Sequence, residues 1–274
     1  MPLAEGVWAW WNPYGSLPVA SCVRRAKEAR LRGVIVKAGY PEARGAFDQA
    51  GIPWATERYV YPDRPEEEAH RLAQEVAAGA RFAVINAEVE WEPLGPDPMR
   101  RLIAELRRLH LDVELYASVD TRGGRTALPY QRVLAEHVAG WMPMCYPLAF
   151  RPHQPAGYVA QAFRDCLDRK DFRGKPVLPT IQTYDGIGAE AVAQQIAEVR
   201  RRGLPGYQAY TIAHATDAEW AAVQRDAEER EMEAIDEVRR WQAVAGLFLQ
   251  AAGYAQRGQP LPEELKAQIR YLLA

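Results

Sequence analysis

The chain has 274 residues, 48% of them hydrophobic and 26% charged, and a formal net charge of −2. This length suits one large domain or two small ones. A nucleic-acid-binding protein would need a concentrated basic stripe, whereas the basic residues here, mostly Arg, are scattered among acids on predicted helices. No apolar run reaches the roughly 18 residues that span a membrane. We therefore expect neither a nucleic-acid partner nor membrane insertion.

Three further features bear on the setting of the protein. The start, Met-Pro-Leu-Ala-Glu-Gly, lacks the basic and apolar regions of a secretory signal, so we expect a protein that is cytoplasmic as synthesised. Cys22, Cys145 and Cys166 show no CxxC or metal spacing, which indicates a reduced compartment or buried thiols. Asn12 and Asn86 are the only asparagines. Scarce amides fit a thermophilic source, although a GC-rich genome gives a similar bias.

Short apolar runs alternate with amphipathic stretches, a pattern typical of βα units and a parallel sheet. The predicted strands are Gly6–Trp11, Gly33–Ala38, Ile52–Tyr59, Phe82–Glu88, Asp112–Val119, Gly140–Tyr146, Val177–Thr183 and Gly206–Ile212. The predicted helices between them are Pro18–Leu31, a single turn within Gly45–Gly51, Pro65–Ala78, Pro98–Leu109, Tyr130–Ala139, Tyr158–Asp168 and Glu190–Arg202. Eight strands is the number that closes a (β/α)8 barrel of about 250 residues.

The competing α/β architecture is a doubly wound open sheet, which usually has a Gly-rich turn after its first strand. Here that strand ends in Trp10-Trp11-Asn12-Pro13. We therefore predict a (β/α)8 TIM barrel over residues 1–225 and a C-terminal helical extension over residues 226–274. The extension either packs on its own barrel or serves homo-oligomerisation or docking to a larger assembly.

In such barrels the functional site lies at the carboxyl ends of the strands. On the fourth strand Asn86, Glu88 and Glu90 share one face, because side chains alternate with a period of two. That face points into the barrel mouth if Ala83 and Ile85 pack on the helices. A carboxyl group among apolar and aromatic side chains should have a raised pKa, as a general acid near neutral pH requires.

The other strand ends supply further candidate residues. These are Trp10, Trp11, Asn12, Lys37, Tyr116, Asp120, Tyr146, Gln182, Asp185 and Tyr210. Each has a structural alternative: the rings can be rim packing, and Asp120 and Asp185 can cap turns. Lys37 can form a Schiff base or pair with a carboxylate such as Glu88, and we favour the pair.

The predicted mouth combines carboxyl groups, amides and aromatic rings, and the sequence offers neither a metal-ligand set nor a phosphate-binding Gly-rich loop. Rings stack on the faces of a sugar, and amide and carboxyl groups bind its hydroxyls. Glycoside cleavage needs a proton donor and a second group that stabilises the cation or positions water. We therefore predict a polysaccharide partner and no cofactor or metal.

The Asn86-x-Glu88 pattern resembles the Asp-x-Glu of phage-lysin-type muramidases and of chitinase-like barrels. The resemblance to glycoside-hydrolase-like (β/α)8 barrels covers about residues 6–215 in strand layout and is specific only in the fourth strand. It implies that Glu88 is the general acid. In those families an Asp stands where this chain has Asn86, and it orients the substrate acetamido group or stabilises the ion formed from it.

Three hypotheses follow. The first is a glycosidase acting on peptidoglycan or another N-acetylated glycan, with Glu88 as acid and Asp120 or Asp185 as the second group. In it Tyr116, Tyr146, Gln182 and Tyr210 hold the sugar, and Trp10 or Trp11 stacks on it. The second is a catalytically silent glycan-binding or structural barrel, attached through its tail to a larger assembly such as a phage particle. A released phage lysin is the corresponding setting for the enzyme. The third is a lyase that uses Lys37.

Overall fold

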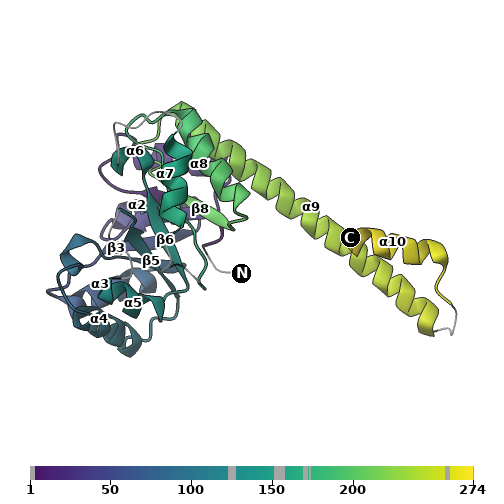
Figure 1. Cartoon of the computed structure of the whole chain (residues 1–274), viewed down its shortest axis with the longest axis horizontal. Helices are drawn as coiled ribbons and strands as arrows, with labels where there is room; N and C mark the ends of the chain where they lie inside the picture. Colours follow the sequence, from purple (N-terminus) through teal and green to yellow (C-terminus); the bar gives the residue numbers. More distant parts are fainter. Residues whose placement is uncertain are drawn as a thin grey trace. The chain divides into compact units, whose positions relative to one another are not determined.

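The computed structural model describes residues 4–122, 128–150, 158–168, 172, 174–256 and 260–273. Within these residues eight parallel strands pair in chain order, and β1 pairs with β8, so the sheet is a closed barrel (Figure 1). The predicted (β/α)8 fold is confirmed, and the open sheet is excluded. The strands are β1 (Gly6–Trp11), β2 (Gly33–Lys37), β3 (Trp54–Tyr59), β4 (Phe82–Asn86), β5 (Glu114–Asp120), β6 (Gly140–Cys145), β7 (Thr180–Gln182) and β8 (Gly206–Tyr210).

The helices are α1 (Val19–Glu28), α2 (Pro41–Gln49), α3 (Pro65–Ala77), α4 (Asp97–Arg108), α5 (Pro129–Ala135), α6 (Pro147–Phe150), α7 (Tyr158–Leu167), α8 (Ala189–Arg201), α9 (Asp217–Gln256) and α10 (Glu263–Leu273). The predicted helices are all present, but α6 was not predicted, α5 ends before the predicted Ala139, and α2 is longer than expected. The single turn predicted before β3 is wrong, because α2 has 9 residues. Pro41 begins it, a position where proline suits a helix, and Ala43 and Phe47 lie one turn apart and are buried.

Alternate strand residues point to the two sides of the barrel wall. One set fills the interior, and it includes Trp8, Trp10, Ile35, Ala55, Phe82, Val84, Tyr116, Met142 and Leu178. The other set packs between the wall and the surrounding helices, and it includes Val7, Ala9, Val34, Ala83, Ile85 and Ala117. The interior is therefore a packed core, and only the end layers of the barrel can carry polar chemistry.

Glycine permits the tight packing at the start of β2. A Cβ atom at Gly33 would lie 2.3 Å from the Trp8 ring and 2.5 Å from the carbonyl oxygen of Pro53. The large Trp8 ring, 2% exposed, fills this part of the interior. The absence of a side chain at Gly33 thus leaves the space that the Trp8 ring occupies in the core.

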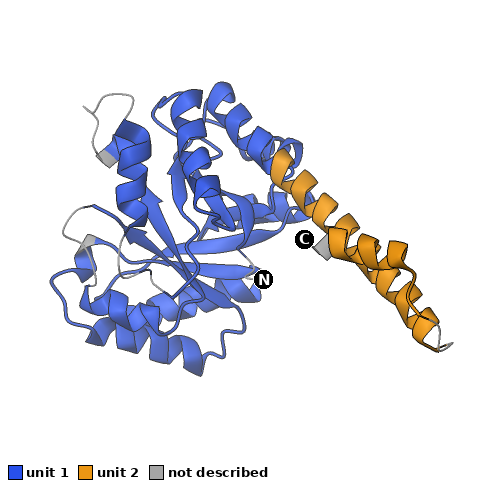
Figure 2. Cartoon of the chain, turned by 45° about the vertical axis from the view of Figure 1, so that its right-hand side comes forward, with its two compact units in different colours: residues 1–227 blue, residues 228–274 orange. Residues whose placement is uncertain are grey.

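The chain divides into two compact units, Met1–Ala227 and Glu228–Ala274 (Figure 2). The first holds the barrel with its helices and the first residues of α9. In the second, α10 lies alongside the later part of α9 (Figures 1 and 2), and Val244 and Leu265 are buried there. No helix in the described part of the chain is both long and apolar enough to cross a membrane.

Candidate active site

A cavity of about 460 Å³ opens at the carboxyl ends of the strands. Its walls combine carboxyl, amide, guanidinium and phenol groups with one indole ring. The lining residues are Trp10, Asn12, Tyr14, Asn86, Glu88, Ser118, Asp120, Arg122, Met144, Tyr146, Tyr184, Asp185, Tyr210 and His214. The structure therefore brings together eight residues proposed from the sequence, which are Trp10, Asn12, Asn86, Glu88, Asp120, Tyr146, Asp185 and Tyr210.

Glu88 lies just beyond β4, half-buried in the wall of this cavity. Ala83, Ile85 and Ala87 pack under the helices, which leaves the alternate side chains facing inward as expected. Burial raises the pKa of the Glu88 carboxyl, and the nearby charge of Asp120 raises it further. A hydrogen bond from Asn86 and the charge of Arg122 act in the opposite direction. The net effect favours a carboxyl that keeps its proton at higher pH than an ordinary glutamate.

Behind Glu88 lies a second carboxyl group, Glu57 on β3, which is 4% exposed. Asn86 hydrogen-bonds the side chains of both Glu57 and Glu88. Burial raises the pKa of Glu57, and the neighbouring Lys37 charge partly offsets this. The Lys37 charge therefore acts on Glu57, its register partner on the adjacent strand, whereas the sequence favoured a pair of Lys37 with Glu88.

Asp120, at the end of β5, is 4% exposed and is bound by Arg122. The backbone N–H of Arg122 donates to one carboxylate oxygen at 2.8 Å, and Nε donates to the other at 2.7 Å. A terminal guanidinium nitrogen donates to that second oxygen as well. Three donors on one carboxylate stabilise its ionised form. The cavity thus contains one carboxyl group driven toward protonation and one held in an ion pair.

Aromatic rings form another part of the wall. Tyr146, Tyr184 and Tyr210 contact one another with ring centroids 5.4–5.6 Å apart. Trp10 contacts Tyr210 at 5.7 Å, and the Asn12 amide donates to the Tyr210 hydroxyl at 3.2 Å. Burial raises the pKa of Tyr210 to about 12, so this hydroxyl is a neutral hydrogen-bonding group at neutral pH. Rings with hydroxyls at their edges can bind the faces and hydroxyls of a sugar together.

Five predicted site residues are not among those that line the cavity, and three of them lie on β1, β5 and η1. Trp11 points to the outer layer and contacts Tyr40, because it alternates with the inward-facing Trp10. Tyr116 has the predicted inward orientation but lies in the buried interior, where its hydroxyl donates to Glu114 at the start of β5. Glu90 belongs to the 3₁₀ helix η1 (Val89–Trp91), which breaks the strand period, and it is exposed with the Tyr59 hydroxyl bonded to it.

Two predicted site residues, Gln182 at the end of β7 and Asp185 in the following turn, have different roles. Gln182 is 1% exposed, and its side-chain oxygen accepts from the backbone N–H groups of Leu148 and Ala149, each at 3.1 Å. It therefore holds the start of α6 and is not among the residues that line the cavity. Asp185 does line the cavity, at an exposed turn where it adopts a φ of 62°.

Sequence inspection missed Glu57, Arg122 and Tyr14. Glu57 had a usable signal, because it alternates with the inward-facing Ala55 along Trp54–Tyr59. Arg122 lies within a segment that the sequence shows only as a turn. Tyr14 follows β1 in a loop, and its ring lies 5.4 Å from the Lys37 ammonium. No regular pattern places a loop residue of this kind.

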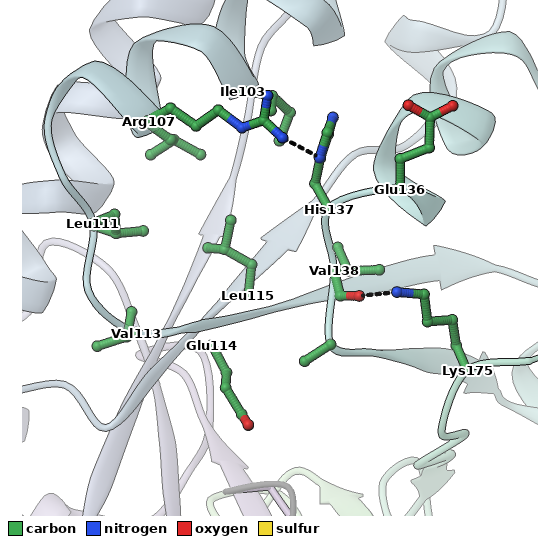
Figure 3. Close-up of a pocket in the computed structure, with 12 residues that line it drawn as sticks. Ile103, Arg107, Leu111, Val113, Glu114, Leu115, Glu136, His137, Val138 and Lys175 are labelled. Atoms are coloured by element: carbon green, nitrogen blue, oxygen red, sulfur yellow. Dashed lines mark hydrogen bonds between the residues drawn. The ribbon is translucent and has the colours of Figure 1, made fainter.

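A second cavity, of about 400 Å³, lies near the amino ends of β5 and β6 (Figure 3). Apolar residues from α4 and β5 line it with Arg107, His137 and Lys175. Arg107 hydrogen-bonds the His137 ring, and Lys175 donates to the Val138 carbonyl. This end of a barrel usually serves stability. Nowhere in the described residues do three or more His, Cys, Asp or Glu side chains gather as a metal site would need.

No protein-family model and no curated protein matches the sequence. Solved structures do match. A class V chitinase from Pseudomonas fluorescens is 12% identical, with a TM-score of 0.58 over 81% of this chain and 99% of that one. A putative chitinase domain from Desulfitobacterium hafniense is 11% identical, with a TM-score of 0.56 over 81% and 99%. The spore cortex-lytic enzyme SleL of Bacillus megaterium is 8% identical, with a TM-score of 0.55 over 80% and 73%. The chain shares the (β/α)8 fold of these glycoside hydrolases.

Proposed function

We propose that this protein is a glycosidase whose substrate is a polysaccharide, most specifically peptidoglycan or another N-acetylated glycan. The observation that carries the proposal is the position of Glu88, whose half-buried carboxyl with a raised pKa lines a cavity walled by aromatic rings. The shared fold with two chitinases and a cortex-lytic enzyme supports the same class of substrate.

The two cavity carboxyl groups suit different tasks. Glu88 donates its proton to the glycosidic oxygen, which a carboxyl with a raised pKa can do near neutral pH. Asp120, kept ionised by Arg122, stabilises the positive charge that develops on the sugar. When their surroundings give two carboxyl groups different pKa values in this way, the one with the higher pKa can act as the acid and the other as the charged partner. Asp185 is the alternative partner at the cavity rim.

Asn86 is suited to binding the substrate rather than to stabilising charge. Its amide already bonds Glu57 and Glu88, while its side-chain oxygen is buried without a hydrogen-bond partner in the described residues. An N–H group of the substrate, such as that of an acetamido group, would satisfy this oxygen. An amide remains neutral, so the negative charge that stabilises the cationic sugar must come from a carboxylate. We also propose a thermophilic source, because the chain contains only two asparagines. A phage setting, suggested by the resemblance of Asn86-x-Glu88 to phage-lysin-type muramidases, is part of the same proposal.

One observation favours a second function, in which the barrel binds glycan without cleaving it. Arg122 neutralises Asp120, and an amide occupies position 86. A cavity with these features can retain a sugar while lacking enough negative charge for a cationic transition state. The aromatic wall serves either function equally well.

The test is release of reducing ends from purified peptidoglycan and from chitin oligosaccharides. We expect wild type to release them and Glu88→Gln to lose at least a hundredfold in kcat, within the range general acid catalysis contributes. Glu90→Gln is the matched control, because Glu90 lies two residues away, exposed and outside the cavity lining. An inert wild type that still binds both glycans would favour the binding function. Equal losses in the two variants would reject Glu88 as the acid.

A further inference from the structure

The second compact unit carries large apolar side chains on the exposed surface of α9. Val238, Trp241, Phe248 and Leu249 are 56%, 57%, 51% and 76% exposed. Together with Ala245, they recur at intervals of three and four residues, which places them on one side of the helix. An exposed apolar stripe of this kind marks an interaction surface.

α10 leaves this stripe uncovered. It lies alongside the later part of α9 (Figures 1 and 2), and the residue that α9 buries there is Val244, which is 5% exposed. Leu265 on α10 is buried as well, at 6%. Val244 and Trp241 are three residues apart, which places their side chains about 60° from each other around the helix axis. α10 therefore covers one flank and leaves the adjacent side of α9 open.

Large and small residues alternate along the stripe in a self-complementary way. We propose that α9 pairs antiparallel with α9 of a second copy of this chain, about a two-fold axis midway between Trp241 and Ala245. In that register Trp241 packs against the partner's Ala245. The same register sets Val238 against the partner's Phe248. Ala234 then meets the partner's Ala252. The two largest side chains of the stripe, Trp241 and Phe248, thus each meet a smaller one, as in a symmetric interface, and Leu249 lies at its edge.

The charge distribution selects the direction of the pairing. Residues 228–237 contain six acidic residues and one Arg, whereas residues 238–256 contain Arg239 and Arg240 and no acid. A parallel pair would place the two acidic segments side by side, where like charges repel. The antiparallel register places each acidic segment opposite the acid-free end of the other helix. This pairing is independent of the proposed glycosidase activity.

Sedimentation velocity of the full chain tests the pairing. We expect wild type to sediment as a dimer at micromolar concentration, and Trp241→Asp to weaken the dimer more than tenfold. Met232→Asp is the matched control: Met232 is 52% exposed on the same helix, but nine residues from Trp241 and therefore on the opposite side. It should remain dimeric. Circular dichroism checks that both variants keep their helical content. A monomeric wild type, or a Trp241→Asp variant that still dimerises, would overturn the proposal.

A distance measurement tests the direction. A spin label on Ala234→Cys can be placed selectively, because Cys22, Cys145 and Cys166 are buried. In the antiparallel register, Ala234 of one copy lies opposite Ala252 of the other. The two labelled positions are then about 27 Å apart along the axis, at 1.5 Å per residue. A parallel pair would bring them to within about 10 Å. Only the long distance agrees with the proposal.

Discussion

Lys37 and Glu57 lie opposite each other in the register between β2 and β3. Burial raises the pKa of Glu57, and the charge of Lys37 offsets part of this rise. Glu57 is also hydrogen-bonded to Asn86, and Asn86 to Glu88. Buried Glu57 and the candidate acid Glu88 thus share one amide group. The connection makes the protonation of Glu88 sensitive to changes in residues that do not touch the substrate.

Asn86→Ala should move the alkaline limb of the activity profile to higher pH. The hydrogen bond from Asn86 lowers the pKa of Glu88, so its removal raises that pKa. A general acid must be protonated, and activity is therefore lost as pH rises through the pKa of Glu88. Asn12→Ala is the control, since Asn12 lines the same cavity but bonds Tyr210. A limb that stays in place in Asn86→Ala, measured as kcat against pH, would contradict the assignment of Glu88.

Glu57→Gln should change how stability depends on pH. The pKa of Glu57 is raised in the folded state, so its contribution is fully present below the unfolded pKa of about 4.3 and is lost as pH rises through the folded pKa. Glutamine removes this loss. The free energy of unfolding of Glu57→Gln, relative to wild type, should therefore increase between pH 4 and pH 8 in urea titrations. Glu90→Gln, at an exposed position, should show no such trend.

The sequence was sufficient to predict the barrel because its signals are repeated. Eight apolar runs separated by amphipathic segments specify the same architecture eight times over, so an error in one segment, such as the length of α2, leaves the topology intact. Strand alternation also placed Asn86 and Glu88 on the cavity side correctly. Both predictions depend on local period alone.

Depth along the barrel and contacts between strands could not be predicted in the same way. Tyr116 points inward as predicted but lies in the interior core. The alternation of side chains along a strand shows which side of the wall a residue faces, and it does not show how far along the barrel axis the residue lies. The sequence favoured Glu88 as the partner of Lys37 because Glu57 was not recognised as inward-facing, and only the β2–β3 register shows that Glu57 lies beside Lys37. Gln182 has the orientation of a site residue, but backbone groups of α6 occupy its oxygen.

Tyr184→Ala should weaken glycan binding through loss of the aromatic wall. Tyr184 contacts both Tyr146 and Tyr210 at 5.6 Å and lines the cavity. An aromatic contact contributes about 0.5–1.5 kcal/mol beyond its buried area, so the KM for a chitin oligosaccharide should rise about tenfold. Tyr184→Phe keeps the ring and should stay close to wild type. A large effect of Tyr184→Phe would indicate that the hydroxyl, rather than the ring, binds the sugar.

Gly33→Ala should destabilise the barrel by about 3 kcal/mol, the upper end of the usual cost of overpacking a core. The added methyl would overlap the Trp8 ring at 2.3 Å and the Pro53 carbonyl at 2.5 Å, and the backbone carbonyl cannot rotate away. Gly45→Ala provides a control of opposite sign: Gly45 lies within α2 with nothing within 4 Å of the added atom. Replacing a helical glycine by alanine stabilises by about 0.5–1 kcal/mol. Urea unfolding of the two variants should therefore move in opposite directions, and a tolerated Gly33→Ala would show that Trp8 can repack.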